Sequence, residues 1–396
     1  MEEKINYNFS ESVCREDTNA EKYTLRERLF STQDVMPVWV ADMDIDTPDF
    51  VLDAVKQRLK HPIIGYEEVP NSVWQAQLNW MKNHHGFKYK IENLFYSHSV
   101  VASMGVAINA FSEVGQKVIV QTPVYPPFFY SVINNERKLI KNSLKLEDDG
   151  SYRFDIDDLK SKIDKDTKLL LLCSPHNPVG RVWKREELEE ILEVCLQNKI
   201  VVFSDEIHSD LVYSPNKHIP FATLSEEAKN ITITAVGVGK TFNMAGFAMS
   251  SVIIENEDLK KKFSKVYKQV HFAEGATLSH VAFEAAYTNG NLWLDELKTH
   301  LYKNYLLLKD VCLKFQNDIK ITPIEATYLA WLDCKGMNLS DKKLRDFFVK
   351  EAKLGLNAGL SFGREGSGFM RLNFAVSSVK MSQIILRLES ALKNRK

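Results

Sequence analysis

Cysteine is scarce in this chain. The 396 residues include five cysteines, at positions 14, 173, 195, 312 and 334, and no two of them form a C-x-x-C pair. A disulfide framework uses an even, closely spaced set of cysteines, and a structural zinc site commonly uses C-x-x-C. The cysteine pattern argues against both and favours a reducing compartment. Because no H-E-x-x-H motif or other clustered ligand spacing is present, we expect no metal site.

Long apolar runs and an excess of charge are missing as well. No segment approaches the roughly 18 apolar residues of a membrane span, and the polar residues 1–8 lack the apolar core of a signal peptide. The formal net charge is -1, which gives no basic surface for nucleic acid or an acidic membrane. We therefore expect a soluble cytoplasmic protein that acts on a small molecule, with neither nucleic acid nor a membrane as a partner.

Helical periodicity alternates with buried-strand patterns along most of the chain. Residues 51–59 have apolar side chains at helical spacing after Thr47 and Pro48, a suitable cap and first-turn pair, and residues 188–195 repeat the period. Continuous apolar runs, typical of strands buried on both faces, lie at 118–120, 169–173, 200–203 and 231–236. This alternation predicts an α/β fold with a mostly parallel sheet flanked by helices.

The length of the chain predicts a second domain. A chain of 396 residues exceeds the roughly 250 to 300 at which a single core stops growing. After about residue 290 the pattern changes to a long helical region, 292–317, followed by short strand candidates at 328–332 and 369–374. We predict a large domain over residues 48–288 and a smaller α+β domain formed by residues 1–47 and 289–396.

Side chains with useful chemistry follow four of the predicted strands. Tyr125 comes after the first apolar run, Asn177 after the second, Asp205 after the third and Lys240 after the fourth. In open α/β sheets the ligand crevice lies outside the carboxyl ends of the strands. We therefore expect these four side chains to converge on one crevice.

Lys240 comes after a glycine-rich turn, and two chemistries use a lysine in that position. One is a P-loop lysine that reaches nucleotide phosphates, and the other is a lysine that forms a Schiff base with an aldehyde cofactor. The P-loop pattern G-x-x-x-x-G-K-[ST] fits only at its end, because Thr234 occupies the first glycine position. A threonine resists the positive φ that the glycine would supply. The imine-forming lysine is therefore favoured, and a nucleotide-binding P-loop remains the less favoured alternative.

The four side chains together suit a pyridoxal phosphate site. Lys240 would hold the aldehyde and, once released by the substrate amine, would take the Cα proton as a general base. Asp205 would pair with the pyridine nitrogen through a charge-assisted hydrogen bond. Asn177 would donate to the phenolic oxygen, and Tyr125 would stack on the ring.

Several motifs resemble those of a known superfamily. The sequences S-P-H-N-P-V-G at 174–180, S-D-E-I-H-S-D at 204–210 and G-K-T-F-N-M-A-G at 239–246 resemble signatures of fold-type I pyridoxal phosphate enzymes, the class I/II aminotransferase superfamily. V-W-V-A-D-M-D at 38–44, G-Y at 65–66 and A-T-Y-L-A-W-L-D at 326–333 are similar to the MalY/PatB branch, whose members are cystathionine β-lyases and related carbon–sulfur lyases. The resemblance covers the chain from about residue 38 to residue 371.

The resemblance implies further site residues. His208 takes a place near the phenolic oxygen of the cofactor, and Tyr66 is expected to reach the phosphate in the partner subunit, which implies a homodimer with shared active sites. Arg371 matches the arginine that binds the substrate α-carboxylate, a role that suits its planar, two-pronged guanidinium. Asn177 and Tyr125 are expected to contact the substrate as well.

The phosphate-binding positions depart from the superfamily pattern. Gly237 stands where serine is common, and Ala248 stands where aminotransferases often have an arginine. Val100 and Val101 begin a predicted helix capped by Ser99, and the amides at the start of a helix favour anions. We expect the amides of Val100 and Val101 to compensate for the missing hydroxyl and arginine.

The sequence therefore predicts an enzyme that catalyses α,β-elimination on an L-amino acid with a sulfur leaving group, such as cystathionine or a cysteine conjugate. Lys240 would remove the Cα proton, the thiolate would leave, and pyruvate and ammonia would be the remaining products. The nearest alternative is an aminotransferase with the same cofactor, in which Lys240 returns the proton to another carbon. A third alternative is a regulatory protein that carries the cofactor without turnover.

Overall fold

A central seven-stranded sheet organises the first two thirds of the chain. The computed structural model describes residues 7–11, 13–271 and 276–395, so most of the polar start of the chain lies outside the described residues. The strands of the sheet are β2 (Leu94–Ser97), β3 (Lys117–Thr122), β4 (Lys138–Ser143), β7 (Thr167–Cys173), β8 (Val201–Asp205), β9 (Thr232–Val236) and β10 (Ser250–Ile253). Their order is β2-β10-β9-β8-β7-β3-β4. The pairs from β4 to β9 are parallel, and β10 is antiparallel to both of its neighbours, which confirms the predicted mostly parallel sheet.

Alternate side chains of the sheet pack against helices on its two faces. Leu169 and Leu171 belong to a cluster with α5 (Val100–Phe111), α6 (Pro127–Asn134) and α10 (Glu257–Gln269). Leu170 and Leu172 point the other way, toward α7 (Ile156–Lys162), α8 (Arg185–Gln197) and α9 (Glu226–Ile231). All four leucines are fully buried. Burial on both faces explains why β7 is a continuous apolar run rather than an alternating one.

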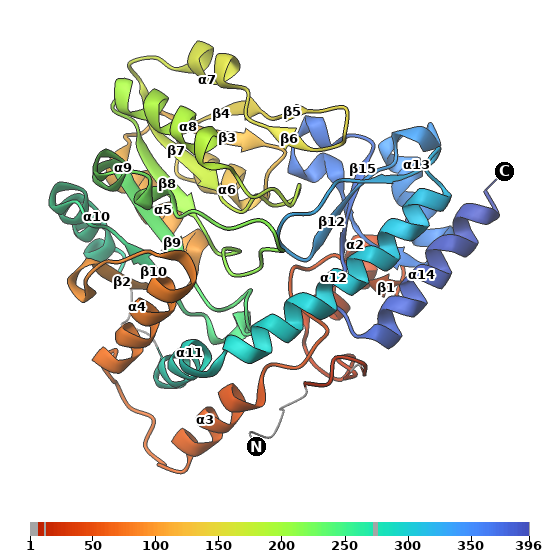
Figure 1. The fold of residues 1–396 in the computed structure, drawn as a ribbon, viewed down its shortest axis with the longest axis horizontal. Helices are drawn as coiled ribbons and strands as arrows, with labels where there is room; N and C mark the ends of the chain where they lie inside the picture. Colours follow the sequence, from red (N-terminus) through yellow and green to blue (C-terminus); the bar gives the residue numbers. More distant parts are fainter. Residues whose placement is uncertain (1–6, 12, 272–275, 396) are drawn as a thin grey trace.

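The carboxyl-terminal part of the chain forms a smaller antiparallel sheet. Its strands, in spatial order, are β11 (Lys320–Ile321), β12 (Leu329–Asp333), β15 (Phe369–Asn373) and β14 (Asn357–Ala358). The helix α12 (Asn291–Lys314) runs from α11 (Thr277–Asn289) toward α13 (Asp341–Asp346) and lies beside α14 (Ser378–Lys393) (Figure 1). A strand of the amino-terminal segment, β1 (Met36–Pro37), pairs with β13 (Leu354–Gly355) of this part.

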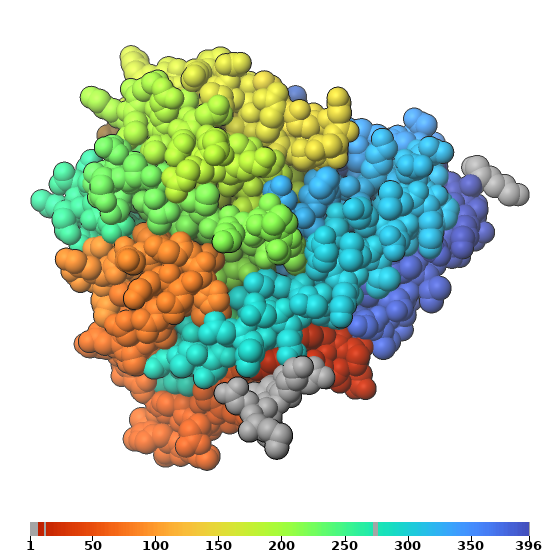
Figure 2. All heavy atoms as spheres, viewed as in Figure 1, coloured from red at the N-terminus to blue at the C-terminus, as the bar shows by residue number. Residues whose placement is uncertain are grey.

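One apolar cluster joins the two parts of the molecule. It extends from Trp80 in α4 (Asn71–His85) through Trp293 in α12 to Leu388 in α14. Figure 2 shows the side chains of α12, in cyan, between the orange amino-terminal helices and the blue carboxyl-terminal part. Because this core is continuous, the domain boundaries at residues 47/48 and 288/289 stay a prediction.

The start of the first long helix differs from the prediction. The helix α3 (Asp49–Leu59) begins after Pro48, and no side chain caps it. The Thr47 hydroxyl donates instead to the carbonyl oxygen of Asn243, at 2.8 Å. The predicted cap at Thr47 is therefore wrong, because the hydroxyl contributes to tertiary structure rather than to the helix end.

Among the described residues, no helix combines the length and apolar character needed to cross a bilayer.

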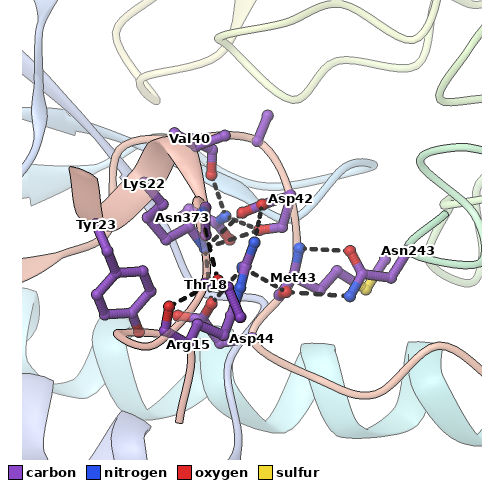
Figure 3. A network of polar contacts seen from close by, with 12 residues as sticks. Arg15, Thr18, Lys22, Tyr23, Val40, Asp42, Met43, Asp44, Asn243 and Asn373 are labelled. Carbon is purple, nitrogen blue, oxygen red and sulfur yellow. Dashed lines mark hydrogen bonds and ion pairs between the residues drawn. The ribbon is translucent and has the colours of Figure 1, made fainter. Parts of the chain in front are cut away.

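The segment of residues 39–44, which we call the strap, is held by a cluster of buried charges (Figure 3). The fully buried Lys22 places its Nζ 2.8 Å from Asp42 Oδ1 and 3.2 Å from Asp44 Oδ1. Lys380 of α14 and Arg15 also pair with Asp44. Segments near the two ends of the chain therefore meet at the strap.

Two asparagines fix the backbone of the strap. Asn373, at the end of β15, donates from Nδ2 to the carbonyl oxygens of Val40 and Asp42. Asn243 accepts from the Met43 amide at 2.9 Å and donates to the Met43 carbonyl oxygen at 3.1 Å. The strap is thus bonded through both its side chains and its backbone.

We predict that Asp44→Asn lowers the free energy of unfolding by about 3 to 5 kcal/mol, because removing one partner of a buried ion cluster leaves the others uncompensated. Burial opposes the charge of Asp44, but Lys22 and Lys380 outweigh it and hold the pKa of the carboxyl at about 2. Urea denaturation measures the loss. The control is Asp34→Asn, which removes an exposed pair with Lys353 and should leave stability unchanged. Equal losses in the two variants would contradict the importance of the buried cluster.

Candidate active site

The residues predicted at four strand ends line one cavity of about 200 Å³. Asp205 is the last residue of β8, and the other three lie in the loops that come after β3, β7 and β9. The cavity is lined, among others, by Val100, Val101, Tyr125, Asn177, Asp205, His208 and Lys240. Because β3, β7, β8 and β9 are parallel, their carboxyl ends share one edge of the sheet.

The Lys240 amine lies against the strap. Its Nζ donates to the carbonyl oxygen of Ala41 at 2.6 Å. Burial, together with the positive charge of Arg371, lowers the pKa of Lys240 to about 8, although Asp42 and Asp205 act in the opposite direction. About a tenth of the amine is therefore unprotonated at pH 7, and this fraction can act as a nucleophile or general base.

The structure does not support the P-loop alternative. In a P-loop the lysine opens a helix whose amino-terminal amides face the phosphates. Here residues 238–243 form turns, a short 3-10 helix begins at Ala245 and ends at Phe247, and α10 begins only at Glu257. The nucleotide-binding alternative is therefore wrong.

Asp205 is a buried carboxyl without a cationic partner at bonding distance among the described residues. One of its oxygens accepts from the Ile207 amide at 3.2 Å. Burial raises the pKa of Asp205 to about 7, and the Ile207 amide and the Lys240 charge only partly oppose that effect. A cationic N–H placed beside this carboxyl would stabilise its charged form. The ring nitrogen of a pyridinium has that chemistry.

Arg371, from the smaller sheet, is not among the lining residues but bonds to one of them, Asn177. It lies on β15, and its Nη1 donates to Asn177 Oδ1 at 3.0 Å. Its Nη2 donates to the Trp39 carbonyl oxygen and to Asn357 Oδ1. The buried Nε has no hydrogen-bond partner among the described residues. Burial lowers the pKa of Arg371 to about 10, so the group stays charged at neutral pH and keeps a donor for an anionic ligand.

His208 and Tyr125 complete the lining around Lys240. Burial, with the charges of Lys240 and Arg371, lowers the pKa of His208 to about 3, so its imidazole is neutral. Its Nδ1 is buried without a partner among the residues that the structure describes. Burial also raises the pKa of Tyr125, whose backbone amide donates to the Asn177 carbonyl oxygen. Both rings are thus uncharged beside the amine.

The structure explains one departure at the predicted phosphate end. A Cβ at position 237 would lie 3.0 Å from the Ser250 Cβ and 3.1 Å from the Ile207 Cδ1, so a side chain there would require both neighbours to move apart. Val100 and Val101 form the first turn of α5, and the Ser99 hydroxyl caps the helix by accepting from the Ala102 amide. The cap predicted at Ser99 is confirmed, and both valines line the cavity as expected.

Tyr66 lies apart from these residues. It is fully exposed in the loop between α3 and α4 and is absent from the cavity lining. The predicted contact of Tyr66 with the phosphate of a partner subunit stays a prediction, because a single chain does not test it.

Two groups near the Lys240 amine were not predicted from the sequence. One accepts the hydrogen bond of the amine, and the other donates to that same acceptor. The first is the Ala41 carbonyl, which has no side-chain signature. The second is the Tyr328 hydroxyl, which donates to the same carbonyl at 2.8 Å. Both lie in motifs that contributed to the family resemblance, at 38–44 and 326–333, but no chemistry was predicted for them.

The fold and site together define a class of protein: an open α/β enzyme with a partly buried lysine and a buried carboxyl at one sheet edge, and a buried arginine from the smaller sheet bonded to the cavity lining. Residues 34–388 match the family of class I and II aminotransferases, and the chain belongs to that family.

Comparison with individual relatives indicates which branch of the family the chain is similar to. The chain is 39% identical to cystathionine beta-lyase PatB from Bacillus subtilis over 97% of this chain and all of the relative. The predicted resemblance to the MalY/PatB branch is thereby confirmed. Cystalysin from Treponema denticola, solved with a pyridoxal 5'-phosphate cofactor, has a TM-score of 0.95 and 33% identity over 99% of this chain and all of its own. A pyridoxal phosphate-bound C-S lyase from Staphylococcus hominis has a TM-score of 0.90 and 33% identity, covering 98% of this chain and 99% of its own.

The described residues fit pyridoxal phosphate. Lys240 offers an amine to the aldehyde, and Asp205 offers a buried acceptor to the ring nitrogen. His208 Nδ1 and Arg371 Nε are buried polar atoms that no described protein group satisfies. Such atoms are rare in folded proteins and are consistent with a bound polar ligand.

We predict that Lys240 in the cofactor-free protein titrates with a pKa of about 8. Competitive amine labelling across a pH series, read by peptide mass spectrometry, measures this value. Lys56 serves as an internal control, because its hydrogen bond to Asp53 raises its pKa above the ordinary lysine value. Identical titration of the two lysines would contradict the effect of burial on Lys240.

Proposed function

We propose that this chain is a pyridoxal phosphate-dependent carbon–sulfur lyase. It would catalyse α,β-elimination on L-amino acids with a sulfur leaving group, such as cystathionine or S-conjugates of cysteine. With one water consumed in hydrolysis of the eliminated amino acid, the products would be a thiol, pyruvate and ammonia. The observation that carries the proposal is the cavity that Lys240 shares with Asn177, to which the buried Arg371 guanidinium donates, with the pKa of Lys240 lowered to about 8. The names of the Bacillus and Staphylococcus relatives support the choice of reaction.

Arg371 would bind the substrate α-carboxylate. Its guanidinium is already oriented by Asn177, Asn357 and the Trp39 carbonyl oxygen, so little reorganisation is needed on binding. A carboxylate held there would place the adjacent Cα close to the Lys240 side of the cavity.

Lys240 would move the proton at Cα. When bound, pyridoxal phosphate supplies an aldehyde that condenses with amines and a ring that withdraws electrons from Cα. The neutral Lys240 amine would take the Cα proton, and the Cβ–S bond would then break with departure of the thiolate. The Ala41 carbonyl would accept a hydrogen bond from the resulting ammonium, as it does from Lys240 here.

Asp205, Asn177, His208 and Tyr125 would hold the cofactor ring. Asp205 would keep the protonated ring nitrogen positively charged, and Tyr125 would pack on the face of the cofactor ring. His208 would orient groups near the phenolic oxygen while staying neutral. These roles rest on the cavity lining, on the unpartnered His208 Nδ1 and on the unpaired Asp205 carboxyl.

Tyr66 would complete the site of a second copy, which makes the functional unit a homodimer. The full exposure of Tyr66, together with the neighbouring exposed side chains of Ile63 and Ile64, supports this assignment. A cytoplasmic location, a large domain over 48–288 and a small domain formed by 1–47 and 289–396 belong to the same proposal.

The alternative function is an aminotransferase with the same residues, which the description of the matching family favours. The two reactions share binding and Cα deprotonation, and they differ in the fate of the deprotonated substrate. An aminotransferase needs a keto-acid acceptor to complete its cycle, whereas a lyase does not.

We predict that the purified protein releases thiol and pyruvate from L-cystathionine without any keto acid, measured with a thiol reagent and a pyruvate-coupled assay. Lys240→Arg should lower kcat about 10²- to 10⁴-fold, because it retains a cation but removes the general base. The control variant is Lys56→Arg, an exposed lysine outside the site, which should keep full activity. Strict dependence on a keto acid would favour the aminotransferase instead.

A further inference from the structure

The structure offers a replacement for the hydroxyl that position 237 lacks. The Ser250 Cβ occupies the space beside Gly237, at 3.0 Å from where a Cβ of residue 237 would stand. Ser250 begins β10 and lines the same cavity as Lys240. Its hydroxyl donates to the Ser97 carbonyl oxygen at 3.2 Å, a long bond that the hydroxyl can exchange, by rotation, for one to an acceptor in the cavity. A serine of β10 therefore occupies the space beside position 237.

A second group stands near the backbone of Ala248, where aminotransferases often have an arginine. The Tyr96 hydroxyl donates to the Ala248 carbonyl oxygen at 3.1 Å and lies 2.9 Å from His98 Nδ1. The Tyr96 hydroxyl has one proton for these two contacts, and when it donates to His98 Nδ1 the imidazole carries its own proton on Nε2 and can donate it to a ligand. His98 also lines the cavity, next to Val100 and Val101.

These contacts place an imidazole and a hydroxyl in the same cavity lining as the amino-terminal turn of α5. Backbone amides of Val100 and Val101 favour an anion by their orientation, but they carry no full charge. An imidazole N–H and a serine hydroxyl are further donors for phosphate oxygens. Tyr96 fixes the ring by bonding its Nδ1, so the imidazole is already oriented.

We propose that His98 and Ser250 bind the phosphate of pyridoxal phosphate and replace the missing serine at 237 and arginine at 248. This inference rests on the proposed function, because it assigns the phosphate end of the same site. Within the site, His98 supplies an imidazole N–H, Ser250 the hydroxyl, and the Val100 and Val101 amides the remaining donors.

The test separates phosphate recognition from imine formation. Cofactor-free protein is titrated by absorbance with pyridoxal phosphate and, separately, with pyridoxal, which has the same aldehyde and ring but no phosphate. The proteins are the wild type, His98→Ala, Ser250→Ala and the control Ser251→Ala. Ser251 is the next residue of β10 and points to the other face, where its hydroxyl donates to Gln77 Oε1 at 2.9 Å.

We expect His98→Ala to raise the Kd for pyridoxal phosphate about tenfold or more, as loss of a hydrogen bond to a charged group does. Ser250→Ala should raise it by about threefold to tenfold. Both variants should leave the Kd for pyridoxal within about twofold of the wild type, which also shows that their fold and Lys240 are intact. Ser251→Ala should change neither constant by more than about twofold.

Two results would overturn the inference. One is an unchanged Kd for pyridoxal phosphate in both variants, and the other is an equal loss for the two ligands. In either case an imine at Lys240 would leave the proposed function standing. If the wild type formed no adduct with either aldehyde, the proposed function would fail, and this inference would fail with it.

Discussion

The hydrogen bond from Lys240 Nζ to the Ala41 carbonyl oxygen is the interaction on which the site depends. The acceptor is neutral, so it directs the amine without stabilising the ammonium as a carboxylate would. Burial therefore decides the protonation state, and Arg371 adds to its effect. The carboxyl that could have paired with the lysine, Asp205, itself has a pKa raised to about 7 by burial. The protein thus keeps an amine and a carboxyl in one cavity with both groups close to their titration points.

Ala41 is held in position by ion pairs between charged residues that do not line the cavity. The strap carries Asp42 and Asp44, and their partners Lys22 and Lys380 come from segments near the two ends of the chain. Burying such a cluster brings a large desolvation penalty, which is offset only when each charge is paired. Backbone bonds from Asn243 and Asn373 restrict the strap further. The strap is therefore restrained through both side chains and backbone, which favours a fixed position for the Ala41 carbonyl oxygen beside the Lys240 amine.

The sequence was informative where one physical rule dominates. Continuous apolar runs predicted β3, β7, β8 and β9, because a strand buried on both faces has few polar positions. The rule that ligands bind at the carboxyl ends of parallel strands then predicted one cavity for four side chains, those of Tyr125, Asn177, Asp205 and Lys240. Prediction from the sequence failed where a contact between segments far apart in the chain determines what a group does. The Ala41 carbonyl has no side-chain signal, and the Thr47 hydroxyl bonds Asn243 rather than a helix end. The role proposed for Ser250 depends on the short distance between its Cβ and position 237, which the sequence does not give. The role of Tyr66 depends on a second chain, which no pattern within one sequence describes.

The central claim is that Lys240 is the amine that carries the cofactor aldehyde. Borohydride reduction of the purified protein loaded with pyridoxal phosphate, followed by peptide mapping, tests it most directly, because reduction makes the imine permanent at the residue that formed it. We expect a pyridoxyl group on the peptide that contains Lys240 and none on the buried Lys22 or Lys380. A pyridoxyl group on another lysine, or no pyridoxyl peptide at all, would contradict the claim.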